Sequence, residues 1–163
     1  MDQDKAHYIV ATVIIVKDGK YLITKRAPHE KAFPNQWTVP GGKLKVSEYI
    51  NRPMDVEKEG LWYNVFENLA KREVLEETNL KIKNIGYVTS LVYIRSDNIP
   101  TIIVSLYGEY KSGEVKLCKD LTDFAWVSLE ETKNYELIGG IYEEIEMLEG
   151  KLKRKDIGEW KKK

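Results

Sequence analysis

Residues 72–80 read REVLEETNL, and the helix that carries this stretch decides how the rest of the chain is interpreted. The apolar spacing over residues 61–78 is helical, and Asn79 follows where a left-handed C-terminal cap is expected. At about 100° per residue, one helix face is apolar over its first two turns. That face contains Trp62, Val65, Phe66, Leu69 and Ala70. Its continuation contains Glu73, Glu76 and Glu77, so the sequence predicts an acidic cluster that points inward.

The spacing of these three glutamates suggests a bound cation. Carboxylates at i, i+3 and i+4 repel one another, and most amphipathic helices keep such charges opposite their apolar face. Arg72 can reach Glu76, but one guanidinium does not neutralise three carboxylates, whereas a hard divalent cation with oxygen ligands does. The alternative from helix geometry alone is a solvated acidic face.

The segments around this helix predict a protein richer in strands than in helices. Residues 8–16 and 21–24 are expected to form a hairpin with an Asp18-Gly19 turn. Residues 27–35 are expected to be loop, and 36–44 an extended segment broken by a Pro-Gly-Gly corner where a ligand can approach the backbone. Further strands are predicted at 82–94, 101–110 and 124–127, followed by a helix at 141–152.

Taken with Gly42 and with Glu48 five residues beyond it, the stretch 72–80 resembles the Nudix box. That pattern is glycine, five residues, glutamate, a spacer, then Arg-Glu-apolar-X-Glu-Glu-X-Gly-apolar. The resemblance covers about residues 8–131, including Trp37 before the Gly-Gly corner and the segment 126–129. It implies a single-domain α/β fold, the α/β/α sandwich of this family around a mixed β-sheet.

The resemblance also implies a cofactor and a set of roles. Glu73, Glu76 and Glu77 would bind Mg²⁺, or Mn²⁺, together with the backbone carbonyl at Gly42, and one of the glutamates could act as base. Arg72 would orient a carboxylate that binds the metal. Metal ions held there would bridge a diphosphate and activate the water that attacks phosphorus.

The sequence departs from the family pattern twice. Seven residues usually separate the first glutamate from the arginine, but 23 separate Glu48 from Arg72, so sixteen have been added and Glu48 need not keep its place in space. Residues 49–60 are interpreted as an inserted loop near the active-site mouth, either a lid or a dimer contact. Asn79 replaces the last glycine, and both residue types accept the left-handed conformation of a helix end.

Further candidate residues lie outside the box. Asp120 is expected to complete the metal site or to act as base, with Asp123 and Glu114 as alternatives, and each could instead be a solvated loop acid. Arg26 and Lys43 are candidates for binding substrate phosphates, although either could be an ordinary surface cation. Trp37 could stack on a base or belong to the core.

Composition limits the remaining possibilities. A chain of 163 residues with 42% hydrophobic residues fits one domain, taken here as 1–163. Basic and acidic residues balance at 26 each, so no overall field attracts nucleic acid or an anionic membrane. The single cysteine, Cys118, and the lack of a signal-like start indicate a cytoplasmic protein. His7 and His29 have no partners at metal-ligand spacing, and neither is assigned to a metal.

The leading hypothesis is a pyrophosphohydrolase acting on a nucleoside diphosphate linked to another moiety. Its substrate is expected to be a small nucleotide of the nucleoside triphosphate or nucleotide-sugar class, without a membrane or nucleic-acid partner. Dimers are common among proteins that resemble this one, so a homodimer is one expectation. The alternatives are a non-catalytic nucleotide sensor, if the insertion displaces Glu48, and an RNA-end hydrolase, suggested only by the basic tail 151–163.

Overall fold

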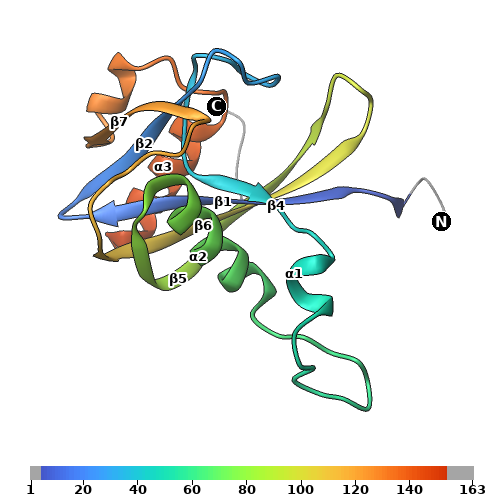
Figure 1. Cartoon of the computed structure of the whole chain (residues 1–163). Helices are drawn as coiled ribbons and strands as arrows, with labels where there is room; N and C mark the ends of the chain where they lie inside the picture. The colour runs from blue at the N-terminus through green and yellow to red at the C-terminus, as the bar shows by residue number, and fades with distance from the viewer. Residues whose placement is uncertain (1–4, 154–163) are drawn as a thin grey trace.

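The computed structural model describes residues 5–153, which form a three-layer α/β/α sandwich (Figure 1). The elements follow in the order β1 (Tyr8–Lys17), β2 (Lys20–Arg26), β3 (Trp37–Thr38), β4 (Gly41–Lys43), α1 (Ser47–Ile50), α2 (Val65–Thr78), β5 (Lys81–Ile94), β6 (Pro100–Ser112), β7 (Leu121–Val127), the 3₁₀ helix η2 (Glu131–Asn134) and α3 (Ile141–Leu152). The sandwich architecture expected from the sequence is confirmed. The basic tail falls mostly on 154–163, outside the described residues.

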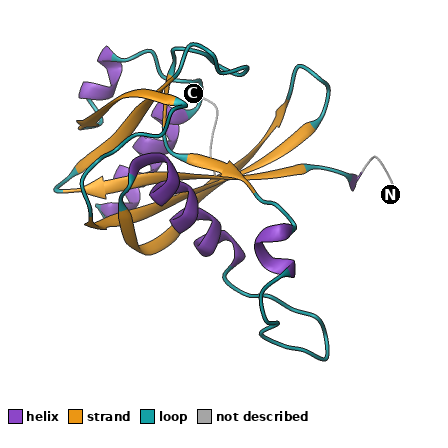
Figure 2. Cartoon of the chain, viewed as in Figure 1, coloured by secondary structure: helices purple, strands orange, loops and turns teal. Residues whose placement is uncertain are grey.

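The seven strands form one mixed sheet, which Figure 2 shows between the two long helices. Strand β1 pairs in parallel with β6 along most of its length, and its other neighbours β2 and β4 are antiparallel to it. Strand β7 pairs with β2, and β5 pairs with β6. The pairing of β1 with β4 brings the Gly-Gly corner to the middle of the sheet.

Alternation along β1 divides the apolar residues between two cores. Ala11, Val13 and Ile15 face one side and pack with Leu69, Ala70 and Val74 of α2. Ile14 faces the other side and packs with Ile145 and Leu148 of α3. The predicted hairpin turn is also confirmed, because Asp18 and Gly19 both have positive φ angles, as a two-residue turn of this type requires.

Helix α2 begins later than predicted. The expected start at residue 61 is wrong because Asn64 adopts a left-handed conformation, with φ of 53°, and Leu61 pairs with Val56. Trp62 therefore lies before the helix. Asn79, with φ of 61°, caps the end of α2 as predicted.

The inserted segment is more ordered than a plain loop. Helix α1 extends into it, and the remainder forms the arm that projects away from the sheet between α1 and α2 in Figure 1. Trp62 closes the base of this arm: its indole Nε1 donates to the carbonyl of Arg52 at 3.1 Å, and its ring lies 5.6 Å from that of Tyr49. Between residues 5 and 153, no helix is long and apolar enough to cross a membrane.

Candidate active site

The Gly-Gly corner of β4 lies directly against two glutamates of α2. A β-carbon added to Gly42 would overlap the carboxylate of Glu73, so this approach requires a residue without a side chain. One turn further along α2, Glu77 accepts a hydrogen bond of 3.1 Å from the backbone N–H of Gly41. The residues at i and i+4 therefore present two carboxylates to one stretch of backbone.

Arg72 binds three carboxylates, one of which is that of Glu73. Its Nη2 donates to Glu48 and to Glu73, both at 2.6 Å, and its Nη1 donates to Glu76 at 2.7 Å. Burial lowers the pKa of Arg72, but Glu73 and Glu48 outweigh this effect and raise it above its usual value. The guanidinium stays charged and fixes the Glu73 carboxylate in place.

Glu48 contacts Arg72 despite the sixteen added residues. Its side chain is only 18% exposed and its contact with Arg72 joins the two ends of the inserted segment. The insertion therefore projects outward without separating the first glutamate of the box from the arginine.

The three glutamates of the helix do not share one environment. The residue Glu73 is 9% exposed and Glu77 is half-buried, but the Glu76 side chain is 59% exposed and contacts Arg72. The expectation that all three point inward is wrong for Glu76. At helical spacing, Glu73 and Glu77 lie directly above one another, while Glu76 is rotated toward solvent.

A segment after β6 returns along the end of α2 and brings in Asp120. The N–H of Cys118 donates to the carbonyl of Glu77 at 3.1 Å, and that of Lys116 donates to the carbonyl of Thr78 at 2.9 Å. The Asp120 charge lies close enough to contribute to the raised pKa of Glu77. Backbone hydrogen bonds between segments far apart in the sequence thus bring Asp120 close to Glu77 on α2.

The two alternatives to Asp120 are placed differently. Glu114 is exposed, and its carbonyl accepts a hydrogen bond of 3.1 Å from Asn79 at the far end of α2. Asp123 is exposed on β7, where its carboxylate accepts the N–H of Phe124 at 2.8 Å.

Electrostatics distinguish the buried glutamates from ordinary surface acids. Burial raises the pKa of Glu77 to about 7; the hydrogen bond from Gly41 opposes this rise, and the charges of Glu73 and Asp120 add to it. Burial also raises the pKa of Glu73, although Arg72 opposes the shift. Both carboxylates are therefore costly to ionise without a further cation, which is the environment that a divalent metal ion stabilises.

Of the two candidate phosphate-binding residues, Arg26 is the one whose charge acts on these acids. Arg26 forms an ion pair with Glu30 and donates to the carbonyl of Ala32 at 2.8 Å, and its charge lowers the pKa of Glu77. Lys43 is exposed beside Gly42, with its ammonium 5.4 Å from the ring centre of Tyr8.

Trp37 lies in the core that covers the α3 side of the sheet. Its ring packs edge-on against Tyr135 with centroids 4.7 Å apart. This is the core environment that the sequence offered as the alternative to stacking on a base.

His29, which was not assigned to a metal from the sequence, lies beside Asp120 in the structure. Its Nε2 lies 2.9 Å from a carboxylate oxygen of Asp120, and these two side chains and Glu30 bring ligand atoms within 4.8 Å of one another. These atoms are close enough to share a cation. Spacing gave no signal for this group because 91 residues separate His29 from Asp120.

Comparison with known proteins gives a consistent result. No protein-family model matches the chain. It is 28% identical over 125 residues to the nucleoside triphosphatase NudI of Escherichia coli, covering 76% of this chain and 84% of that protein. Among solved structures, the MutT protein of Methanosarcina mazei Go1 superimposes with a TM-score of 0.65 at 24% identity, covering 92% and 98% of the two chains. The NUDIX domain of Shewanella oneidensis NrtR, in complex with ADP ribose, gives 0.67 at 17% identity over 91% and 90%.

Proposed function

We propose that the chain is a Nudix hydrolase, a family whose members cleave phosphoanhydride bonds, and that it hydrolyses a nucleoside diphosphate linked to another moiety with Mg²⁺ as cofactor. Divalent metals are general in this family, and Mn²⁺ is a possible substitute for Mg²⁺. Nucleoside triphosphates are the first substrate class to test because the curated relative is a nucleoside triphosphatase. Nucleotide sugars are the second.

One observation carries this proposal: Glu73 and Glu77 are held against the backbone of Gly42 and Gly41 with raised pKa values. These two carboxylates, with the Gly42 carbonyl, would hold the metal. Mg²⁺ would draw charge from the diphosphate and lower the pKa of a bound water.

The remaining residues orient these groups. Arg72 fixes the Glu73 carboxylate and Glu48, so that the acids keep their geometry when substrate binds. Asp120, whose charge acts on Glu77, would complete the ligand set of the metal or accept a proton from the attacking water. Arg26, whose charge acts on Glu77, and the exposed Lys43 next to Gly42 would attract substrate phosphates.

The test is hydrolysis by purified protein with Mg²⁺ and a panel of nucleoside triphosphates, nucleotide sugars, ADP-ribose and dinucleoside polyphosphates. We expect turnover of at least one class. Folded protein that turns over no member of the panel would count heavily against the proposal.

Substitutions within α2 test whether these glutamates hold the metal. Glu73→Gln and Glu77→Gln should each lower kcat at least about 100-fold, because each removes a charge that holds the metal. Glu76→Gln should cost less, since its side chain is largely exposed, and Glu67→Gln on the same helix is the matched control. A loss below tenfold in both Glu73→Gln and Glu77→Gln would remove these residues from direct metal contact.

The sensor alternative loses its main motivation from the position of Glu48. That alternative depended on the insertion displacing this residue, but Glu48 contacts Arg72. Calorimetry with a nucleotide separates the two functions: tight binding without metal and without product would favour the sensor.

Oligomeric state and location stay predictions. A homodimer would double the mass seen by light scattering, and the cytoplasmic location rests on the single cysteine. The RNA-end alternative rests on the tail, and deleting 150–163 tests it: unchanged activity on small substrates, with no RNA affinity in the full chain, would end it.

A further inference from the structure

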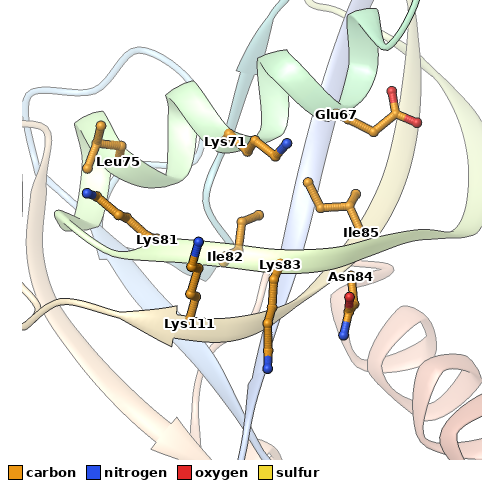
Figure 3. Close-up of a pocket in the computed structure, with 9 residues that line it drawn as sticks. All are labelled: Glu67, Lys71, Leu75, Lys81, Ile82, Lys83, Asn84, Ile85 and Lys111. Atoms are coloured by element: carbon orange, nitrogen blue, oxygen red, sulfur yellow. The ribbon is translucent and has the colours of Figure 1, made fainter.

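A hollow of about 570 Å³ lies between α2 and the neighbouring ends of β5 and β6, and we call it the lysine groove. Four lysines line it: Lys83 of β5, and a group of three made up of Lys71 from α2, Lys81 from β5 and Lys111 from β6. Its aliphatic residues are Leu75, Ile82 and Ile85. Figure 3 shows the three lysines around the same hollow, with Ile82 and Ile85 directed toward α2. Each of these three lysines comes from a different element.

The three ammonium groups lack counterions within residues 5–153. No hydrogen bond or ion pair joins the side chain of Lys71, Lys81 or Lys111 to a described carboxylate. Lys83 is different, because it lies 3.9 Å from Glu109 and extends away from α2 in Figure 3. Glu67, the acid of the groove, lies at the opposite end from Lys81 in the same view.

This concentration of positive charge contrasts with the balanced charge of the whole chain. Like charges gathered without partners repel, and they produce a local positive potential that attracts anions. Ammonium groups bind phosphate oxygens through charge-assisted hydrogen bonds. An anion with several phosphate groups can contact lysines on three elements at once.

The shape of the groove favours a compact ligand over a nucleic acid strand. Its volume falls inside the range of about 300–1,000 Å³ typical of small-molecule pockets. The lysines surround one hollow with an aliphatic floor, whereas a strand would need cations spread along a track. We propose that the lysine groove binds a compact polyphosphate anion, inorganic or carried by a nucleoside.

The lysine groove is separate from the candidate active site. Lys71 and Leu75 lie on the face of α2 turned away from Glu73 and Glu77, since two residues correspond to about 200° of helix rotation. The acids face β4 and need a metal before they attract phosphate, while the groove attracts phosphate directly. Binding there should therefore be independent of divalent metal.

Calorimetry with inorganic triphosphate in metal-free buffer tests the proposal. We expect saturable binding to the wild-type protein. The variant Lys71→Gln/Lys81→Gln/Lys111→Gln should bind at least about tenfold more weakly, because three phosphate contacts are lost. The matched control is Lys45→Gln/Lys58→Gln/Lys116→Gln, which removes the same charge from exposed positions elsewhere and should bind like the wild type.

Two results would overturn the proposal. Absence of saturable binding would do so, as would equal weakening in both lysine variants, which would indicate only general attraction to positive charge. Circular dichroism and thermal unfolding of each variant test whether it is folded, and because these lysines are exposed we expect every variant to fold.

A second comparison separates this site from the proposed hydrolase function. Glu73→Gln/Glu77→Gln should bind triphosphate without metal as well as the wild type does, whether or not the protein hydrolyses nucleotides. Binding that depended on these two acids would place the ligand elsewhere and refute the groove. Tighter binding of a single-stranded RNA than of triphosphate, abolished by the groove substitutions, would refute the compact ligand.

Discussion

Gly42 allows β4 to approach α2 closely. The Glu73 carboxylate occupies the space that a side chain at position 42 would need. The φ angle at Gly42 is not in the left-handed region, so the requirement comes from contact with Glu73 and not from backbone conformation.

Gly42→Ala should therefore lower kcat about 100-fold, because a displacement of roughly 1 Å at a positioned group is enough for such a loss. The fold should persist, since the added methyl group meets a side chain at the edge of the site. Gly139→Ala is the control, because a β-carbon there has nothing within 4 Å. Steady-state kinetics with circular dichroism measures both, and wild-type kcat in Gly42→Ala would contradict the contact.

Glu144 is a second buried acid, on the opposite side of the sheet. It is 5% exposed on α3, and the hydroxyl of Ser105 donates to its carboxylate at 2.6 Å. Burial raises the pKa of Glu144, the Ser105 hydrogen bond opposes the shift, and Glu143 adds to it.

This shift predicts a pH-dependent stability. Above the ordinary glutamate pKa of 4.5 and up to the raised value, the folded protein holds a proton that the unfolded chain has lost. The free energy of unfolding contributed by Glu144 therefore falls as pH rises through that window. Glu144→Gln cannot titrate and should show a smaller fall between pH 5 and pH 8 in urea unfolding. Glu57→Gln in the exposed arm is the control, and an identical pH profile for Glu144→Gln and wild type would argue against the shift.

At the scale of elements, local backbone chemistry was predictable and long-range pairing was not. The Asp18-Gly19 turn and the Asn79 cap follow from positive φ at single residues, and both were predicted. The start of α2 was missed because the apolar spacing continues through Trp62 while Asn64 interrupts the helix. The apolar spacing indicates which side chains share a helix face, and it carries no information about the φ angle of Asn64.

The candidate site likewise has a part that could be predicted from the sequence and a part that could not. The carboxylates of α2 and the Gly-Gly corner were recognised from short patterns in the sequence. The contact between Glu48 and Arg72 spans 24 positions and that between His29 and Asp120 spans 91, so both depend on how separate elements meet. The exposure of Glu76 depends on the same packing, because its place on the helix wheel alone did not show which edge solvent reaches.

Trp62 allows a test of how the arm is anchored. Trp62→Ala removes the ring contact with Tyr49 and the hydrogen bond to Arg52, and should destabilise the segment by about 1–3 kcal/mol. Limited proteolysis should then cut residues 51–61 faster. Tyr63→Ala, at a position that is 58% exposed, should leave the cleavage rate near wild type. Equal protection in the two variants would mean that Trp62 does not hold the arm.

At the scale of the whole molecule, the sheet separates two hydrophobic cores. The candidate site is assembled from segments that are far apart in the sequence. The acids come from α2, the corner from β4 and Asp120 from the segment before β7, so the site exists only in the folded protein. A metal that binds there stabilises the folded state relative to the unfolded chain.

Adding Mg²⁺ at about 100 times its dissociation constant should therefore raise the free energy of unfolding by about 2.7 kcal/mol. Thermal unfolding with and without the ion measures this, and KCl at equal ionic strength is the control. The Tm increase should vanish in Glu73→Gln/Glu77→Gln. An increase of the same size in that variant would show that the ion binds elsewhere.

The contact between Glu48 and Arg72 also makes the arm between α1 and α2 a suitable place to insert a foreign peptide. Because the two ends of the arm are clamped at 2.6 Å, extending the spacer from seven to 23 residues costs only about 1 kcal/mol of chain entropy. A fluorescent reporter or an affinity epitope inserted between Met54 and Gly60 would lie in the arm. It would project away from the sheet and from α2, which position the acids.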